Sequence, residues 1–199
     1  MYVKDWFSKL SVMDADIEYD FLAGTSRIIK QSAFDWRVLL ADTGMDTMTG
    51  GRIKRIAEYI PDEIFLLTYG DAVSDVDLKA LVAEHKLNDP MVTLTTVKPE
   101  GRFGVVETNP DKRISSFQEK NKADHSWING GYMVVNRKIF EYIDGDSNVF
   151  ERDTLPVVTR LGEVRAYEHN GFWQCMDTQR DKNLLESLWI DGAPWKIWE

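Results

Sequence analysis

“FLLTYGDAVSDVD”, residues 65–77, joins an apolar run to a glycine, an aspartate and two further acids. The continuous apolar run EIFLLTY (63–69) is typical of a strand buried on both faces of a mostly parallel sheet. Asp71 follows that strand at its carboxyl end, where open α/β sheets bind their ligands. Gly70 has no side chain, so a ligand can come close to the backbone there. We therefore interpret Asp71 as a ligand of a divalent cation that also contacts phosphate.

The acids of this stretch also have other interpretations. Asp71 could cap a turn, and both Asp75 and Asp77 could be the N-cap of a helix over 75–86. For Asp71 we favour the metal, because the residue ends a buried strand. Read alone, Asp75-Val76-Asp77 could be the Asp-x-Asp motif of a metal-dependent nucleotide-sugar glycosyltransferase, although so short a motif often occurs by chance.

The rest of the chain alternates strands with helices. Apolar periodicity predicts strands at 16–22, 35–44, 63–69, 91–97 and 129–136, a pair joined by the turn 109–112 within 103–120, and two short strands around Asn170-Gly171. It predicts helices at 2–10, 48–60, 75–86, 137–144, 149–162 (where Pro156 kinks or restarts the helix) and 179–190. This order indicates an α/β fold with a mostly parallel, mixed sheet flanked by helices. We expect one domain over 1–199, with 178–199 forming a carboxy-terminal helix and a tryptophan-rich tail.

Charge and cysteine content exclude several classes of partner. Lys plus Arg is 24 against 33 for Asp plus Glu, a net charge of −9, and this argues against nucleic acid, which needs clustered cations. Cys175 is the single cysteine and cannot form an internal disulfide, so we expect a reducing cytoplasm. The sequence has neither the roughly 18–20 apolar residues of a membrane helix nor an export signal at its start.

A glycine- and hydroxyl-rich stretch precedes the predicted helix at 48–60. DTGMDTMTGGR (42–52) offers backbone N–H groups and short donors suited to a phosphate or a base edge, and Arg52 adds a planar fork of donors. An irregular turn with ordinary helix capping is the alternative, and spacing alone does not decide between the two.

Two later stretches carry further polar candidates. Glu119 could accept hydrogen bonds from sugar hydroxyls and Lys120 could neutralise a phosphate, although a bare Glu-Lys pair is more often solvated. Trp173 could form an aromatic wall or simply belong to the core. Asp177 is an acid in the apolar setting GFWQCMDT and needs a partner there.

These motifs have a specific order: DTMTGGR, YGD, GRFG, FQEK, NGG, GFWQCMDT and finally GAPWKIW. In that order the whole chain resembles the sugar-nucleotidyltransferase family, and its glucose-1-phosphate cytidylyltransferase branch in particular. The resemblance implies a Rossmann-like nucleotidyltransferase fold, Mg²⁺ as cofactor, and CTP and glucose 1-phosphate as substrates. It also implies the products CDP-glucose and pyrophosphate, and a place in O-antigen and polysaccharide biosynthesis.

The resemblance carries roles to matching positions of this chain. It implies that Asp71 and Asp177 hold the metal and, with Lys120, form the catalytic set. It assigns Thr47, Arg52 and Gly70 to the nucleotide. The sugar phosphate would contact Gly104, Glu119, Lys120, Asn129, Gly130 and Trp173. One departure is Asn121, which stands where the family usually has proline after the Glu-Lys pair.

A larger departure is the glycine-rich loop with an arginine that cradles the triphosphate in the family. Nothing like Gly-Gly-x-Gly-Thr-Arg occurs in this sequence, so we expect a chain truncated at its amino terminus relative to the family pattern. We expect it to fold at least in part but not to turn over CTP by itself. A non-catalytic remnant that binds a sugar phosphate or pairs with other subunits is the rival hypothesis.

The tail contains three tryptophans within ten residues, Trp189, Trp195 and Trp198. Their combined apolar area is costly to leave in water, at roughly 25 cal/mol per Å². We therefore expect them to dock on the chain's own core or on a neighbouring subunit, and we expect a homo-oligomer.

Overall fold

The computed structural model describes residues 2–13, 15–30, 36–98, 105–108, 114–118 and 127–198. The chain falls into two compact units, 1–42 and 43–199, and each is described by itself. The family-like motifs at 42–52 and beyond lie almost wholly in the second unit, so that unit contains the described part of the candidate site.

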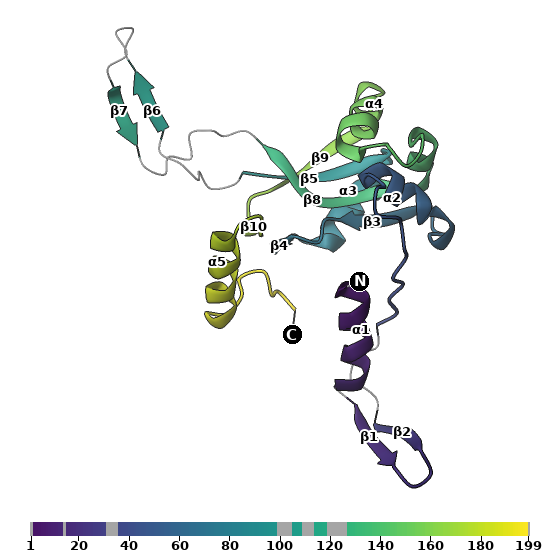
Figure 1. Cartoon of the computed structure of the whole chain (residues 1–199). Coiled ribbons are helices and arrows are strands. Elements are labelled where there is room, and N and C mark those ends of the chain that lie inside the picture. The colour runs from purple at the N-terminus through teal and green to yellow at the C-terminus, as the bar shows by residue number, and fades with distance from the viewer. Residues whose placement is uncertain are drawn as a thin grey trace. The chain divides into compact units, whose positions relative to one another are not determined.

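The first unit consists of one helix and one hairpin. α1 (Tyr2–Met13) is followed by β1 (Asp16–Asp20) and β2 (Thr25–Lys30), which pair antiparallel (Figure 1). Asp20 Oδ1 accepts hydrogen bonds from two turn amides at 2.9 Å, and Gly24 takes a φ of +67°, which closes the turn. The helix predicted at 2–10 and the strand predicted at 16–22 are confirmed, while β2 was not predicted.

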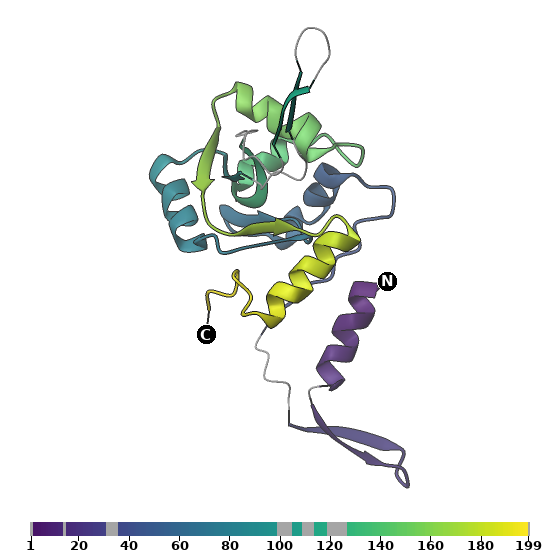
Figure 2. The same ribbon diagram turned by 90° about the vertical axis from the view of Figure 1, so that its left-hand side faces the viewer.

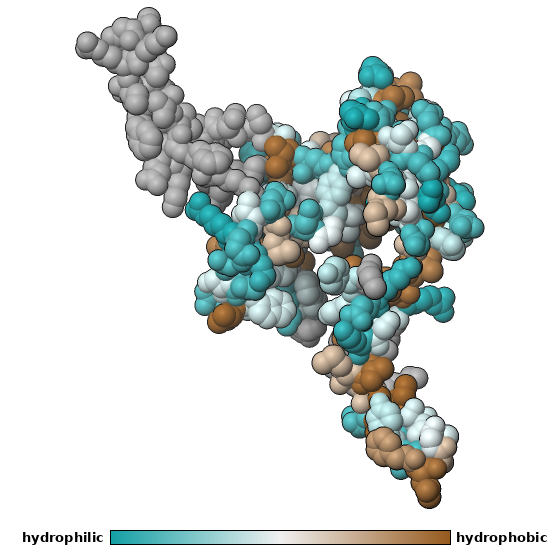
Figure 3. Space-filling model, viewed as in Figure 1, coloured by the Kyte–Doolittle hydropathy of each residue, from teal (hydrophilic) through white to brown (hydrophobic). Residues whose placement is uncertain are grey.

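None of the described residues of this unit is buried. Apolar side chains are exposed on the hairpin, among them Phe21, Leu22, Ile28 and Ile29, and the space-filling view shows brown atoms there (Figure 3). The strand predicted at 35–44 is wrong, because 36–44 has no regular structure and pairs with no strand in the described part of the chain.

A mixed four-stranded sheet forms the centre of the second unit, in the order β3-β8-β5-β9 (Figure 1). β8 pairs antiparallel with both β3 and β5, whereas β5 and β9 are parallel. The α/β class and the mixed sheet are confirmed, and within the described sheet the parallel part is the β5/β9 pair. The bounds are β3 (Ile64–Thr68), β5 (Val92–Val97), β8 (Ile128–Asn136) and β9 (Val164–His169).

One face of this sheet packs against a cluster of short helices. Met133 and Val135 of β8 and Val92 of β5 are less than 1% exposed and join side chains from these helices in a single core. The helices are α2 (Thr49–Arg55), η1 (Ala57–Tyr59), η2 (Arg137–Tyr142), η3 (Phe150–Thr154) and α4 (Leu155–Arg160). Pro156 lies in the first turn of α4, immediately after the π-helical turn η3, so the predicted restart at this proline is confirmed.

The opposite face is covered by α3 (Leu78–Asn88) (Figure 2). Leu81 and His85 of α3 are fully buried, and His85 Nδ1 lies 2.9 Å from Thr93 Oγ1 of β5. Since successive residues of a strand face opposite sides, Thr93 faces α3 while Val92 faces the helix cluster. The centre of the sheet, at β5 and β8, is therefore covered on both faces.

β3 departs from the strand that its sequence predicts. It lies at an edge of the sheet and pairs antiparallel with β8; Phe65 and Leu67 pack on the core, whereas Leu66 is 53% exposed. The prediction of burial on both faces is therefore wrong. A uniform apolar run does not show that one face is open, because alternation is the only signal for that in a sequence.

Outside the main sheet, β4 (Ala72–Ser74) pairs antiparallel with β10 (Trp173–Cys175). The predicted strand pair within 103–120 is confirmed as β6 (Val105–Thr108) and β7 (Ile114–Gln118), and its turn lies outside the described residues. α5 (Gln179–Ile190) follows β10, as the sequence predicts. No helix among the described residues has the length and apolar character to span a membrane.

The tail after α5 docks only in part. Trp195 is 8% exposed and stacks on Phe172, with ring centroids 5.6 Å apart, and on Trp189 at 6.2 Å. Trp189 and Trp198 are each 60% exposed. Docking on the chain's own core is thus confirmed for Trp195 alone.

Candidate functional site

Asp71 lies between β3 and β4, and Asp177 lies two residues after the end of β10. The β4/β10 pair brings the two together, because Cys175 is the partner of Ala72 and Met176 N donates to Asp71 O at 2.7 Å. Two acids separated by about a hundred positions in the sequence therefore occupy neighbouring positions at one end of this ladder.

These carboxylates fit a magnesium ion better than a zinc ion. Both aspartates are exposed, and the described residues contain no group of three or more His, Cys, Asp or Glu side chains able to hold a metal. Mg²⁺ characteristically takes one or two carboxylates and completes its shell with water and substrate phosphate oxygens. A pair of exposed carboxylates is the donor set such an ion uses, and Asp177 Oδ2 also accepts from Cys175 Sγ at 3.3 Å. That the two share one ion stays a prediction.

Gly70 leaves open space beside Asp71. A Cβ built at this glycine meets no atom of the described residues within 4 Å, and its φ lies outside the left-handed region. Neither packing nor backbone conformation therefore requires glycine at this position. Space for a ligand is a remaining explanation for glycine at position 70, and it agrees with the predicted contact of Gly70 with the nucleotide.

Asn129, Gly130 and Trp173 form the described part of the predicted sugar side. Trp173 Nε1 donates to Gly130 O at 2.8 Å, which ties β10 to the start of β8. A Cβ at Gly130 would lie 2.9 Å from a Val97 methyl, so this glycine is needed for close packing. Asn129 Oδ1 accepts from the backbone N of Gly131 at 2.8 Å. The structure thus brings these three predicted residues together.

Tyr69 is a residue of this site that the sequence interpretation missed. Its hydroxyl donates to Glu151 Oε1 at 2.6 Å and accepts from Asn129 Nδ2 at 3.1 Å. Glu151 Oε2 accepts in turn from Thr49 Oγ1 at 2.8 Å. Burial raises the pKa of the Tyr69 hydroxyl above its usual value, and Glu151 and, more weakly, Asp71 raise it further. The available signal was a tyrosine at the end of an apolar strand, since a buried hydroxyl needs a partner.

Thr47 lies two residues before α2 and Arg52 lies within it, and both already have protein neighbours. Thr47 is 6% exposed. Arg52 donates to Thr43 Oγ1 at 2.7 Å and to Met45 O at 3.1 Å, so its guanidinium closes the turn before the helix. The predicted contact of these two residues with a nucleotide is not tested by this arrangement.

The glycine pair of this stretch has a structural role. Gly50 N and Gly51 N both donate to Asn148 O, at 2.9 and 3.3 Å, and a Cβ at Gly50 would lie 1.9 Å from Asn148 Oδ1. These two N–H groups, which the sequence suggested for a phosphate or a base, are bonded to protein. The glycines let α2 pack closely on the 145–149 turn. The structural interpretation of this stretch, an irregular turn followed by an ordinary helix start, therefore accounts for both glycines.

The acids of Asp75-Val76-Asp77 also have protein partners. Asp77 is the N-cap of α3 and accepts from Ala80 N at 2.9 Å, so the cap prediction is right for Asp77 and wrong for Asp75. Asp75 Oδ1 instead lies 2.9 Å from His169 Nε2. Because one carboxylate caps a helix and the other faces a histidine, nothing in this geometry favours the Asp-x-Asp motif of a glycosyltransferase.

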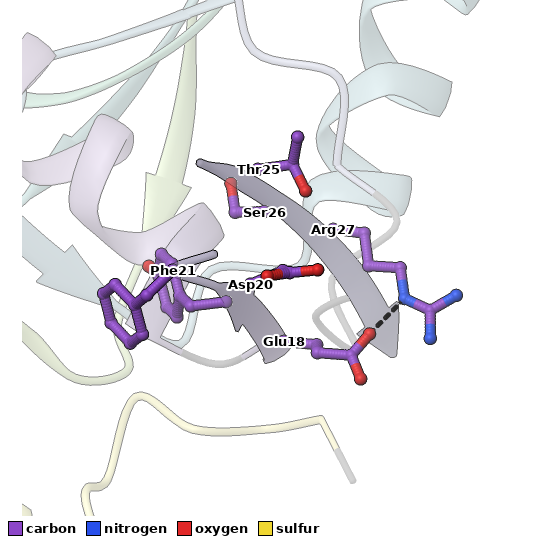
Figure 4. Close-up of a pocket in the computed structure, with 7 residues that line it drawn as sticks. Glu18, Asp20, Phe21, Thr25, Ser26 and Arg27 are labelled. Carbon is purple, nitrogen blue, oxygen red and sulfur yellow. Dashed lines mark hydrogen bonds and ion pairs between the residues drawn. The ribbon is translucent and has the colours of Figure 1, made fainter. Parts of the chain in front are cut away.

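Gly104, Glu119 and Lys120 lie outside the described residues, so their predicted sugar and phosphate contacts stay predictions. A separate hollow of about 560 Å³ lies on the β1–β2 hairpin, where Glu18 and Arg27 form an ion pair (Figure 4). Its lining residues are all exposed, and none of them belongs to the predicted site. We assign no function to this hollow.

Comparison with known proteins gives a consistent match. The family model described as nucleotidyl transferase matches residues 25–191. A glucose-1-phosphate cytidylyltransferase of Salmonella typhimurium is 43% identical over 199 residues, covering 99% of this chain and 77% of that protein. A probable glucose-1-phosphate cytidylyltransferase of Bacillus subtilis is 35% identical over 200 residues, covering 98% and 77%. The crystal structure of HddC from Yersinia pseudotuberculosis superimposes with a TM-score of 0.52 at 26% identity, covering 70% of this chain and 61% of that one.

Proposed function

The chain belongs to the nucleotidyl transferase family, and from that premise we propose that it serves cytidylyl transfer from CTP to glucose 1-phosphate. The products would be CDP-glucose and pyrophosphate. The observation that best supports the proposal is the hydrogen bond from Met176 N to Asp71 O, which sets Asp71 and Asp177 at neighbouring positions. Two exposed carboxylates beside a glycine with space around it suit a metal ion and phosphates.

The chemistry needs positioning more than a reactive side chain. An oxygen of glucose 1-phosphate forms a bond to the α-phosphorus of CTP. The bond from that phosphorus to the bridging oxygen breaks, and pyrophosphate leaves with its electron pair. The attacking phosphate is already ionised, so no side-chain nucleophile is required.

Named residues of this chain have separate tasks in the proposal. Asp71 and Asp177 would hold Mg²⁺, which when bound neutralises phosphate charge. Gly70 would admit the nucleotide, with Thr47 and Arg52 on the base side. The sugar phosphate would be oriented by Gly104, Glu119, Lys120, Asn129, Gly130 and Trp173.

We expect the chain by itself to bind ligands without detectable turnover. The sequence contains no glycine-rich run with an arginine that could cradle a triphosphate. Losing one preorganised donor for transition-state charge typically lowers the rate by a factor of about 10² to 10³, and such a loop supplies several donors. A non-catalytic remnant is the rival, and it would have no need of a metal-binding Asp71.

Calorimetric titration tests this proposal. Glucose 1-phosphate with Mg²⁺ should bind the purified chain, and Asp71→Ala should weaken that binding at least about tenfold, equivalent to 1.4 kcal/mol. Mannose 1-phosphate serves as the ligand control, and UTP and GTP serve as controls for CTP. Failure of the wild-type chain to bind glucose 1-phosphate or CTP would contradict the proposal, and equal binding by Asp71→Ala would favour the rival.

Pyrophosphate release from CTP and glucose 1-phosphate tests the expected lack of turnover. A rate of about 1 s⁻¹ or more, as competent enzymes reach, that disappears in Asp71→Ala would support the transfer reaction and refute the argument from the missing loop. A homo-oligomer and a cytoplasmic location are further parts of the proposal. Sedimentation velocity at two protein concentrations measures the first.

A further inference from the structure

Four side chains, three from helices or strands and one from the segment after β3, form one chain of hydrogen bonds beside the proposed sugar site. Thr49 lies at the start of α2, Glu151 in η3, Tyr69 after β3 and Asn129 in β8. The successive distances are 2.8 Å from Thr49 Oγ1 to Glu151 Oε2, 2.6 Å from Tyr69 OH to Glu151 Oε1, and 3.1 Å from Asn129 Nδ2 to Tyr69 OH. Asn129 is the member of this set with a role in the proposed function.

Both ends of this chain are anchored to the backbone. Thr49 Oγ1 accepts from Phe150 N at 2.9 Å, and Asn129 Oδ1 accepts from Gly131 N at 2.8 Å. Every hydroxyl, carboxylate oxygen and amide group in this chain of hydrogen bonds therefore has a fixed orientation. An amide whose oxygen and nitrogen are both bonded in this way cannot be flipped without losing both bonds.

The aromatic ring of Tyr69 is fixed as firmly as its hydroxyl. Gly131 takes a φ of +83°, and a Cβ there would lie 2.7 Å from Tyr69 Cδ2, so the ring lies directly against the glycine backbone. Tyr69 N also donates to Gly131 O at 3.3 Å. The ring and backbone of Tyr69 thus contact the same β8 segment whose Asn129 side chain the hydroxyl bonds.

From this geometry we propose that Tyr69, held by Glu151, is a positioning residue for glucose 1-phosphate, and that it acts by fixing the side chain of Asn129. The inference rests on the proposed function, because Asn129 is assigned to the sugar phosphate there. With the hydroxyl of Tyr69 accepting one Asn129 N–H, the second N–H and a free lone pair of the amide oxygen remain for the ligand. Tyr69 itself does not touch the sugar in this proposal.

A double-mutant cycle separates positioning from a general structural role. Tyr69→Phe keeps the ring and removes the hydroxyl, and it should raise the dissociation constant of glucose 1-phosphate about threefold to tenfold, as for one ordinary hydrogen bond. The dissociation constant of CTP should change by less than about twofold. In an Asn129→Ala background, Tyr69→Phe should have no further effect, because the group through which it acts is gone.

Tyr132→Phe is the matched control. Tyr132 is also half-buried, and its hydroxyl makes a hydrogen bond to a backbone carbonyl, that of Ala72, at 3.0 Å, without contact to Asn129. Its removal should leave the glucose 1-phosphate affinity within about twofold. Equal losses from Tyr69→Phe in the wild-type and Asn129→Ala backgrounds would overturn the positioning role.

A second readout needs no ligand. In ¹⁵N NMR spectra the Asn129 side-chain amide should show a hydrogen-bonded, slowly exchanging proton in the wild-type chain and in Tyr132→Phe, and should lose it in Tyr69→Phe. An unchanged Asn129 amide in Tyr69→Phe would refute the inference even if the chain bound no sugar phosphate. Absence of binding by the wild-type chain would refute the proposed function instead, so the two failures are distinguishable.

Discussion

Gly70 offers a direct way to separate ligand access from folding. Because a Cβ at this position meets no atom of the described part of the chain within 4 Å and the φ is not left-handed, we expect Gly70→Ala to cost no packing or backbone strain. Replacing such a glycine with alanine commonly stabilises a protein by about 0.4–1 kcal/mol through the unfolded state. For a chain of this size, that corresponds to a rise in Tm of about 1–4 °C. Gly70→Leu should fold equally well, since its side chain extends into the same open space.

Ligand binding should respond in the opposite direction. If a nucleotide approaches Asp71 over Gly70, the isobutyl group of Gly70→Leu occupies its path, and the dissociation constant of CTP should rise at least about tenfold, or 1.4 kcal/mol. Thermal unfolding and calorimetric titration of CTP with Mg²⁺ measure the two effects on the same samples.

Gly131→Ala is the contrasting control. Its Cβ would lie 2.7 Å from the Tyr69 ring at a φ of +83°, so we expect a loss of about 1–3 kcal/mol in the free energy of unfolding. A stable Gly70→Leu that binds CTP as well as the wild type would refute the argument that this glycine exists to admit a ligand.

Three further predictions concern His85, the tail and the metal. Burial lowers the pKa of His85 below its ordinary 6.5, so below pH 6.5 the unfolded chain binds a proton that the folded one does not. As the pH is lowered below 6.5, the unfolding free energy of the wild-type chain should therefore fall relative to that of His85→Gln, by up to about 1.4 kcal/mol per pH unit. Urea titrations of both proteins at several pH values measure this difference, and a difference that does not change with pH would contradict the prediction. Trp195→Ala should lower stability by about 3 kcal/mol and Trp198→Ala by less than about 0.5, since only the first is buried; equal effects in urea would show that the tail docks differently. Asp177→Asn should weaken Mn²⁺ binding, followed by electron paramagnetic resonance, at least about tenfold. Asp77→Asn, which keeps a helix cap, should not change it, and loss in both variants would place the ion elsewhere.

Local periodicity predicts most of the elements in the second unit, because their apolar spacing follows the face they bury. The helix over 179–190 and the restart at Pro156 are examples. Pairing is not local, and here the sequence was a poorer guide. The two strands around Asn170-Gly171 look like neighbours, yet β9 pairs with β5 and β10 pairs with β4. Nothing within 164–178 specifies either partner.

The first unit shows a different limit of sequence interpretation. Residues 36–44 have strand-like composition, but strand propensity describes a half-buried, paired surface, and this segment pairs with no strand in the described part of the chain. The neighbouring β2 was missed although Ile28 and Ile29 favour a strand. Its pairing with β1 depends on a short turn that alternation does not report.

The residues of the candidate site show the same difference between local signals, which a sequence contains, and pairings between distant segments, which it does not show. Asp71 could be chosen as a candidate from the sequence because its strand and its glycine are local signals, whereas the metal role of Asp177 was predicted from the family resemblance. Tyr69 and Glu151 could not, since each is explained only by the other: 82 positions separate them in sequence and 2.6 Å separate their oxygens. A half-buried carboxylate and a half-buried phenol each cost free energy when left without a hydrogen-bond partner, and they stabilise one another when paired. Such a pair holds Asn129 in one orientation only if both partners are present. Losing either Tyr69 or Glu151 should therefore weaken binding of the sugar phosphate. Asp71 and Asp177 should stay in place, because the backbone hydrogen bond from Met176 N to Asp71 O does not involve the side chains of Tyr69 and Glu151.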